Sequence, residues 1–291
     1  MSTPLVLSIQ SHVAYGHVGN RAAVFPLERL GVEVMPVHTV QLSNHTGYAT
    51  FPGDVFGAAH VSRVLGGVAE RGAFARCDAV LSGYLGDAAL AAVVAGAVDA
   101  VKAARPGALY ACDPVMGDRD GGLYVSPEIP EAMRGRLLPR ADVLTPNHFE
   151  LEQLAGGRAQ TLAEVLDAAA TLRRLGPALV LVTSLEVEGG PPGPRDKVSM
   201  LLSTPSAAWR VDTPRVGFDV EPNGAGDLVS ALFLGRLLQT GDPVAALEHM
   251  AAAVAGVFEP TRRAGRRELA LVQAQAELVN PARPVRAVRV D

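Results

Sequence analysis

Lysine is nearly absent from this chain, since only Lys102 and Lys197 occur although lysine and arginine together number 26. Neither lysine follows a glycine, so the sequence lacks the GxxxxGKS/T pattern of P-loop nucleotide-binding proteins. No GxGxxG opens a helix after an apolar strand, and the HExxH pattern of zinc proteases is also missing. Any phosphate chemistry in this chain must therefore use another kind of phosphate cradle.

The chain also has few cysteines and a small net charge. Cys77 and Cys112 are too few for a disulfide framework or a zinc site. A net charge of −4 without a basic block argues against a nucleic-acid or membrane surface, so we expect neither partner. No apolar run reaches membrane length and no charged leader opens the chain, which favours a cytoplasmic protein. Hydrophobic residues are plentiful at 48%, enough for a sizeable core.

Apolar strand patterns alternate with helical patterns along the whole chain. This alternation predicts an α/β fold with a mostly parallel central sheet and helices on both faces. No linker or repeat divides the chain, so we predict one domain over residues 1–291. Strands are expected at 5–10, 32–40, 79–86, 109–112, 141–144 and 179–182, with an antiparallel pair at 200–202 and 208–211. Helices are expected at 20–30, 54–71, 87–105, 161–175, 242–258 and 269–278, and after residues 147 and 224.

The segment Asn-Gly-Ala-Gly-Asp at 223–227 leads straight into an apolar helical pattern. The first amides of a helix have no intrahelical acceptor, and the helix dipole makes this end partly positive. Glycines let an anion approach those amides. Asp227 would repel a phosphate there, but it fits as a base that takes a proton while the amides hold a transferring phosphoryl group. The alternative is an aspartate that merely stabilises the first helical turn.

Polar side chains follow most of the predicted strands, where ligands gather in sheets of this kind. The loop at 41–48 is crowded with hydrogen-bonding groups and is either a ligand site or a solvated turn. The Gly- and Asp-rich stretch at 115–124 is either a lid or a long loop. Lys102 is expected to be a solvated surface charge, and His12 and His17 to be loop residues satisfied by backbone groups.

Several short motifs follow one another along the chain: IQSHV at 9–13, GHVGN at 16–20, SNHTGY at 43–48, LSGYLG at 81–86, CDPVMGD at 112–118, LTPN at 144–147 with Glu150, and GAGD at 224–227. Taken together, these segments resemble the pyridoxal kinase family of the ribokinase-like superfamily. The resemblance spans roughly residues 5 to 260 and implies a three-layer α/β/α fold. Ala225 replaces the threonine of the usual GTGD motif, a tolerable change because the motif works through backbone amides.

The resemblance implies phosphorylation of the 5′-hydroxyl of pyridoxal by ATP, which gives pyridoxal 5′-phosphate. Asp227 would be the base, and the amides of Gly224, Ala225 and Gly226 would stabilise the phosphoryl group. The resemblance further implies Mg²⁺, a monovalent cation such as K⁺, and a homodimer. The expected pyridoxal contacts are Ser11, His45, Thr46, Gly47, Tyr84 and Asp227. The expected ATP contacts are Asp113, Thr145, Glu150, Thr183, Thr213, Pro214, Arg215 and Val216. The expected metal ligands are Asp113, Asp118 and Glu150.

Two other functions remain open. A hydroxymethylpyrimidine kinase of the same superfamily would share the amides at 224–226, the anion hole for the phosphoryl group. It would differ in the loops around Ser11, Thr46 and Tyr84. A non-catalytic carrier of pyridoxal or its phosphate is the other, although Asp113, Glu150 and Asp227 argue against it. A pyridoxal-phosphate-dependent enzyme fits poorly because neither lysine is placed to form an aldimine.

Overall fold

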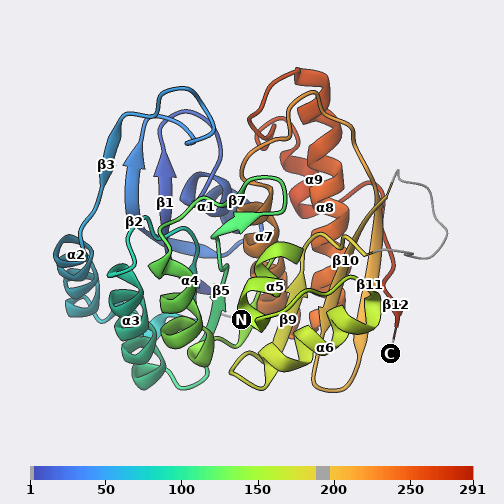
Figure 1. Ribbon diagram of the computed structural model, residues 1–291. Helices are drawn as coiled ribbons and strands as arrows, with labels where there is room; N and C mark the ends of the chain where they lie inside the picture. The colour runs from blue at the N-terminus through green and yellow to red at the C-terminus, as the bar shows by residue number, and fades with distance from the viewer. Residues whose placement is uncertain (1–2, 188–196, 291) are drawn as a thin grey trace.

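The computed structural model describes residues 3–187 and 197–290, and a ten-stranded sheet runs through it (Figure 1). The strand order is β12-β11-β10-β9-β8-β5-β4-β1-β2-β3. Strands β2, β1, β4, β5, β8 and β9 are parallel, and antiparallel strands extend the sheet at both edges. The strands are β1 (Leu5–Val13), β2 (Glu33–Leu42), β3 (Gly53–Val55), β4 (Ala79–Ser82), β5 (Leu109–Cys112), β8 (Val143–Leu144), β9 (Leu179–Val182), β10 (Lys197–Ser203), β11 (Ala208–Pro214) and β12 (Val288–Arg289). The short hairpin of β6 (Gly117–Asp118) and β7 (Gly122–Leu123) forms a second sheet.

Helices cover both faces of the sheet and enclose two apolar cores (Figure 1). In the central strand β4, Val80 faces one core while Ala79 and Leu81 face the other. This alternation explains why the inner strands are apolar at nearly every position. One face is covered by α2 (Ala58–Glu70), α3 (Leu90–Ala104), α4 (Glu128–Ala132), α5 (His148–Ala155) and α6 (Leu162–Arg173). The other is covered by α1 (Asn20–Arg29), α7 (Ala225–Thr240), α8 (Pro243–Ala264) and α9 (Gln275–Val279). Three short helical turns complete the list: η1 (Ala73–Arg76), η2 (Met133–Leu137) and η3 (Leu138–Arg140).

The predicted three-layer α/β/α architecture is confirmed, with differences at the ends of elements. The helix expected from residue 54 begins only at Ala58, because Asp54 lies in β3 and Val55 pairs with Val40 across the sheet edge. The strand expected at 79–86 ends at Ser82, and the helix expected to stop at 258 continues to Ala264. The last expected helix is a shorter α9. A surface excursion expected at 188–196 lies outside the described residues.

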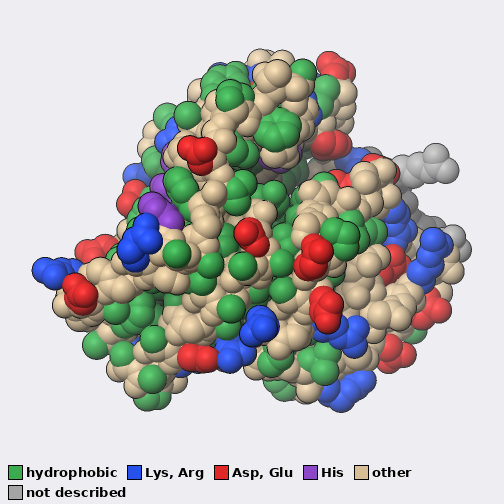
Figure 2. All heavy atoms as spheres, turned by 60° about the vertical axis from the view of Figure 1, so that its left-hand side comes forward, with side chains coloured by type: hydrophobic (Ala, Val, Ile, Leu, Met, Phe, Trp, Pro, Cys, Tyr) green, Lys and Arg blue, Asp and Glu red, His purple; other side chains and the backbone are tan. Residues whose placement is uncertain are grey.

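The six parallel strands end at one edge of the sheet, the upper edge in Figure 1. The polar loops after β1, β2, β4, β5, β8 and β9 therefore meet there, as predicted from their order in the sequence. The face shown in Figure 2 carries acidic and basic side chains interspersed rather than separated by sign. Within the part of the chain that the structure describes, no helix has the length and hydrophobicity needed to cross a membrane.

Candidate active site

The start of α7 lies at this polar edge, and its geometry depends on Gly224. Gly224 is the N-cap of the helix with a φ of 86°, a conformation that side chains rarely adopt. A β-carbon there would overlap the carbonyl oxygen of His17, so the loop before α1 packs directly on the helix start. Gly226 is exposed in the first turn, whereas every residue from Leu228 to Gly235 is buried. Part of the first turn of α7 is therefore accessible to solvent, and the binding of a phosphoryl group by its amides stays a prediction.

Asp227 lies in the first turn of α7 and remains partly accessible to solvent. Burial raises the pKa of its carboxyl from its usual 3.8 to about 6, and a hydrogen bond from the backbone N–H of Gly19 opposes that rise. Gly19 is held by the end of β1, since a β-carbon on it would overlap the carbonyl and hydroxyl oxygens of Ser11. A partly accessible carboxylate with this pKa is deprotonated at neutral pH and able to accept a proton.

A buried chain of polar groups lies directly behind Asp227. Ser230, one turn further along α7, donates its hydroxyl to Oδ2 of Asp113 at 3.0 Å. The hydroxyls of Ser230 and Thr145 are 2.8 Å apart. Burial raises the pKa of Asp113, and the nearby carboxylates of Glu150 and Asp227 raise it further. Helix α7 therefore carries both the partly accessible carboxylate of Asp227 and the hydroxyl of Ser230 that donates to the buried carboxylate of Asp113.

Glu150 is fixed at the start of α5 by a reciprocal capping box with Asn147. Its Oε2 accepts the N–H of Asn147 at 2.9 Å, and its Oε1 accepts the N–H of Met116 at 3.0 Å. The side-chain amide of Asn147 in turn donates to the carbonyl of Gly117 at 2.8 Å. Burial raises the pKa of Glu150, and these backbone donors oppose the rise. The cap thus ties a buried carboxylate to the hairpin that follows β5.

The carboxylates of Asp113 and Glu150 supply hard oxygen donors whose negative charges destabilise one another. A divalent cation would relieve that repulsion, which fits Mg²⁺. Asp118 is exposed, and its Oδ1 accepts the N–H of Gly121 within the hairpin turn. Among the described residues, no group of three or more His, Cys, Asp or Glu is placed to hold a metal by itself. This donor set suits an ion that keeps several waters and bridges phosphate oxygens.

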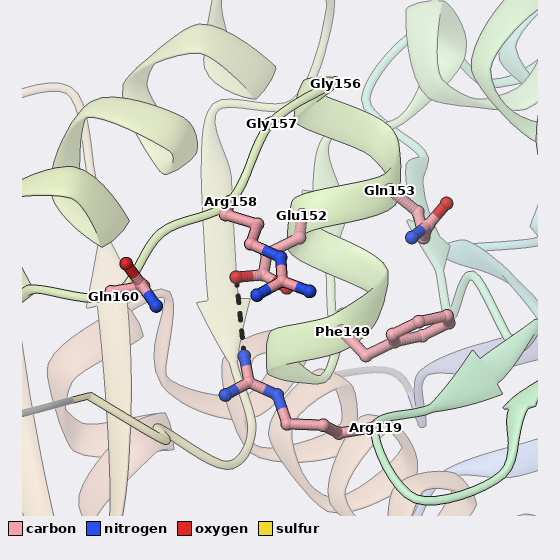
Figure 3. A pocket seen from close by; sticks show the side chains of 8 residues that line it. All are labelled: Arg119, Phe149, Glu152, Gln153, Gly156, Gly157, Arg158 and Gln160. Atoms are coloured by element: carbon pink, nitrogen blue, oxygen red, sulfur yellow. Dashed lines mark ion pairs between the residues drawn. The ribbon is translucent and has the colours of Figure 1, made fainter.

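The flap, defined here as residues 117–124, projects from the carboxyl end of β5 and is tied down by Arg119. The guanidinium of Arg119 lies 3.4 Å from a carboxylate oxygen of Glu152 on α5 and 3.1 Å from one of Glu186 after β9. Figure 3 shows Arg119 reaching toward Glu152, with Arg158 beside that pair. These side chains line a hollow of about 400 Å³ on the outer side of α5. The flap is thus fastened to the loop that carries Thr183.

Tyr124, at the end of the flap, is close enough to the acidic cluster to be influenced by it. Burial raises the pKa of its hydroxyl, and the carboxylates of Glu150, Asp113, Asp118 and Asp227 raise it further. The residue nevertheless remains 52% exposed. The Tyr124 hydroxyl is therefore within electrostatic range of these carboxylates. The sequence named Tyr124 only as the end of a Gly-rich stretch.

The loop of residues 43–48, called the pyridoxal loop after its expected ligand, follows β2 and presents Thr46 and Gly47 to solvent. The Nδ1 of His45 accepts the N–H of Gly47 at 3.0 Å, which holds the turn. Burial lowers the pKa of His45, so its ring is neutral at neutral pH. Tyr84, after β4, is half-buried, and its carbonyl accepts the hydroxyl of Thr39 at 2.7 Å.

The expected nucleotide contacts lie further along the same sheet. The backbone N–H of Thr183 donates to the carbonyl of Pro146 at 3.0 Å. Thr213 is buried, and its hydroxyl donates within the sheet to the carbonyl of Val198 at 3.5 Å. Pro214 and Arg215 are exposed, and Val216 is half-buried. Their contact with a nucleotide stays a prediction.

Two sequence expectations were wrong. Lys102 is not a solvated charge, because its ammonium lies 2.7 Å from Oδ2 of Asp142 and donates to the carbonyl of Arg140. His12 and His17 are not fully satisfied by backbone groups, since the buried Nδ1 atom of each has no hydrogen-bond partner within residues 3–187 and 197–290. The ring of His12 instead packs on His38, with centroids 4.3 Å apart.

Some residues of the site were missed by sequence reasoning. Gly19 was named only as part of GHVGN at 16–20, without a role for its backbone amide. Ser230 belongs to no motif, although it lies three residues after Asp227 and hence on the same helix face. Arg267 and Glu268 were also missed, and they contact the pyridoxal loop across 220 residues of sequence. No local pattern signals a contact at that separation.

The chain is similar to known kinases over most of its length. The family model described as phosphomethylpyrimidine kinase matches residues 69–269. Pyridoxal kinase PdxY of Rubrobacter xylanophilus is 53% identical over 281 residues, which cover 97% of this chain and 95% of that protein. Pyridoxal kinase PdxY of Deinococcus radiodurans is 46% identical, covering 98% of this chain and 96% of that protein. The pyridoxal kinase from Leishmania donovani in complex with ADP and pyridoxine superposes with a TM-score of 0.89 at 30% identity, covering 99% of each chain. The chain therefore belongs to the pyridoxal kinase family, within the ribokinase-like fold that its motifs predicted.

Proposed function

We propose that this chain is a pyridoxal kinase that transfers the γ-phosphoryl group of ATP to the 5′-hydroxyl of pyridoxal. The observation that carries this proposal is the start of α7, where a partly accessible carboxylate stands among open helix amides. The relatives named pyridoxal kinase cover nearly the whole chain, so the activity is argued for the full length.

In the proposed reaction Asp227 takes the proton of the 5′-hydroxyl of pyridoxal while the hydroxyl oxygen attacks the γ-phosphorus of ATP. The new oxygen–phosphorus bond forms while the bond from that phosphorus to the β–γ bridging oxygen breaks, and ADP leaves. The amides of Gly224, Ala225 and Gly226 donate to the oxygens of the phosphoryl group and so stabilise its charge. The hydrogen bond from Gly19 holds the Asp227 carboxylate in place.

The negative edge of the site requires a cation for ATP to bind. Asp113 and Glu150, with Asp118 at the flap, are the residues that would hold Mg²⁺ together with water and phosphate oxygens. When bound, Mg²⁺ supplies charge neutralisation to the triphosphate. Ser230 orients Asp113 toward that position, and Glu150 is oriented by the cap of α5. A monovalent cation such as K⁺ is proposed on the family resemblance.

The two substrates would bind along the carboxyl ends of the strands. Ser11, His45, Thr46, Gly47 and Tyr84 are proposed to contact pyridoxal next to Asp227. The proposed ATP contacts, besides the metal-facing carboxylates, are Thr145, Thr183, Thr213, Pro214, Arg215 and Val216. We also propose that residues 1–291 fold as one domain, because strands from both halves of the chain join one sheet. A homodimer and a cytoplasmic location are proposed on the resemblance.

The test is a substrate panel with purified protein, ATP and Mg²⁺. Release of ADP and formation of pyridoxal 5′-phosphate are expected with pyridoxal. The description of the matching family model favours hydroxymethylpyrimidine as the competing substrate, so both are measured side by side. Turnover of hydroxymethylpyrimidine alone would assign the sister activity. Pyridoxal binding without ADP release would mark a carrier and refute the proposal.

A further inference from the structure

The segment Arg266 to Leu269, which follows α8, lies between the loops that build the two halves of the site. The backbone of this segment contacts the residue just before the proposed anion hole, the amides of residues 224–226. The N–H of Asn223 donates to the carbonyl of Arg267 at 3.1 Å. Asn223 also forms an isolated parallel β-bridge with Glu268. Since Asn223 immediately precedes Gly224, this segment supports the start of α7 directly.

The side chains of the same segment hold the pyridoxal loop. The hydroxyl of Tyr48 donates to Oε1 of Glu268, and Nη1 of Arg267 donates to the carbonyl of Gly47 at 3.0 Å. The guanidinium of Arg267 also lies 5.1 Å from the centroid of the Tyr48 ring, within cation–π range. The hydrogen bond to Glu268 raises the pKa of Tyr48 to about 12, so its hydroxyl remains a donor at neutral pH.

Glu268 has few alternatives to its bond with Tyr48. It is only 8% exposed, and its buried Oε2 has no hydrogen-bond partner among the described residues. Its methylene is confined as well, since a β-carbon on Gly16 would lie 3.0 Å from its Cγ. A buried carboxylate that lost its remaining side-chain donor would be costly. The Tyr48–Glu268 contact is therefore a charge-assisted bond that the surrounding structure favours in one geometry.

We propose that Glu268 is a positioning residue for pyridoxal, which acts through Tyr48 to hold residues 45–48 at a fixed distance from the anion hole. This proposal rests on the proposed kinase activity. Because one segment supports both the pyridoxal loop and Asn223, it fixes the 5′-hydroxyl relative to the phosphoryl group. The segment contacts Asn223 only through its backbone, and the carboxylates assigned to Mg²⁺ have separate supports in Ser230 and Asn147. We therefore expect ATP binding not to depend on the side chain of Glu268.

The test compares Tyr48→Phe, Glu268→Gln and the double variant with the wild type, after the wild type has been shown to turn over pyridoxal. Each single variant is expected to raise KM for pyridoxal roughly tenfold, the effect of losing one charge-assisted hydrogen bond, and to leave KM for ATP within about twofold. The double variant is expected to raise KM for pyridoxal no further than the single variant with the larger effect, because both changes remove the same contact.

Glu248→Gln is the matched control. Glu248 is also largely buried and accepts two hydrogen bonds, from the N–H of Ala287 at 2.9 Å and from Arg286 at 2.8 Å, but it does not contact the site loops. Its KM for pyridoxal should be unchanged even if its Tm falls. If Glu268→Gln does not fold, Tyr48→Phe decides alone. An unchanged KM for pyridoxal in Tyr48→Phe, equal rises in both KM values, or fully multiplicative effects in the double variant would overturn the proposal. A wild type without turnover would instead refute the kinase function.

Discussion

Replacing Asp227 by asparagine separates catalysis from stability at this site. Asparagine keeps the shape of the side chain and can still accept the hydrogen bond from Gly19, but it cannot take a proton. We expect kcat to fall by roughly 10² to 10⁴, the usual contribution of a general base. KM for pyridoxal and ATP should change little, because the phosphate-binding amides stay in place.

The same change should stabilise the fold. The pKa of Asp227 rises on folding from 3.8 to about 6, so the folded state binds this proton more tightly than the unfolded chain does. The charged carboxylate therefore lowers the free energy of unfolding once the pH exceeds the unfolded pKa. This loss reaches its full value above the folded pKa. It amounts to at most roughly 3 kcal/mol at neutral pH. Removing it should raise Tm by a few degrees, on the order of 2 °C per kcal/mol for a chain of this size.

The assay pairs steady-state ADP release with thermal unfolding at neutral pH. Asp99→Asn is the matched control, since Asp99 forms a surface ion pair with Arg140 away from the site, and its turnover should be normal. In the wild type kcat/KM should fall as the pH drops below about 6, the pKa of the Asp227 carboxyl. Wild-type turnover of Asp227→Asn would refute the base assignment. An inactive variant with a lowered Tm would refute the argument from burial.

Three further outcomes follow from the geometry. Gly224→Ala places a methyl group against the His17 carbonyl at a φ of 86°, so kcat should fall at least about tenfold with a lower Tm; an unchanged rate would mean that the loop yields freely. Glu150→Gln removes a buried charge that faces the proposed Mg²⁺, so half-maximal turnover should need roughly tenfold more Mg²⁺, measured by titration; an unchanged requirement would exclude Glu150 from the metal site. Ser230→Ala removes the donor to Asp113, so KM for ATP should rise roughly fivefold while KM for pyridoxal stays constant; the reverse pattern would contradict the assignment.

The motif at 223–227 could be interpreted from the sequence because its chemistry is local. A glycine at the N-cap, open amides and a carboxylate in the first turn all lie within one helical turn, and the structure has this arrangement. The alternation of strands and helices likewise predicted which loops share an edge, because parallel strands must all end on the same side. The architecture and the placement of Asp113 and Glu150 near Asp227 follow from that rule.

What the sequence could not predict depends on partners distant in the chain. Asp54 was assigned to a helix because β3 has only three residues, all of them exposed, so no strand periodicity marks it. Lys102 was taken as solvated because Asp142 reaches it only once α3 packs on the sheet. The contacts of Arg267 and Glu268 with the pyridoxal loop are of the same kind, since sequence periodicity reports which face is buried but not which side chain meets it.

The support that residues 267 and 268 give to both loops has a consequence for protein synthesis. Asp227 and the whole of α7 are synthesised before this segment, so the proposed base exists before the residues that contact Gly47 and Tyr48. Because α8 is synthesised in between, these contacts can form only once residue 268 has left the ribosome. We therefore expect the arrangement proposed for catalysis to form only after α8 has been translated.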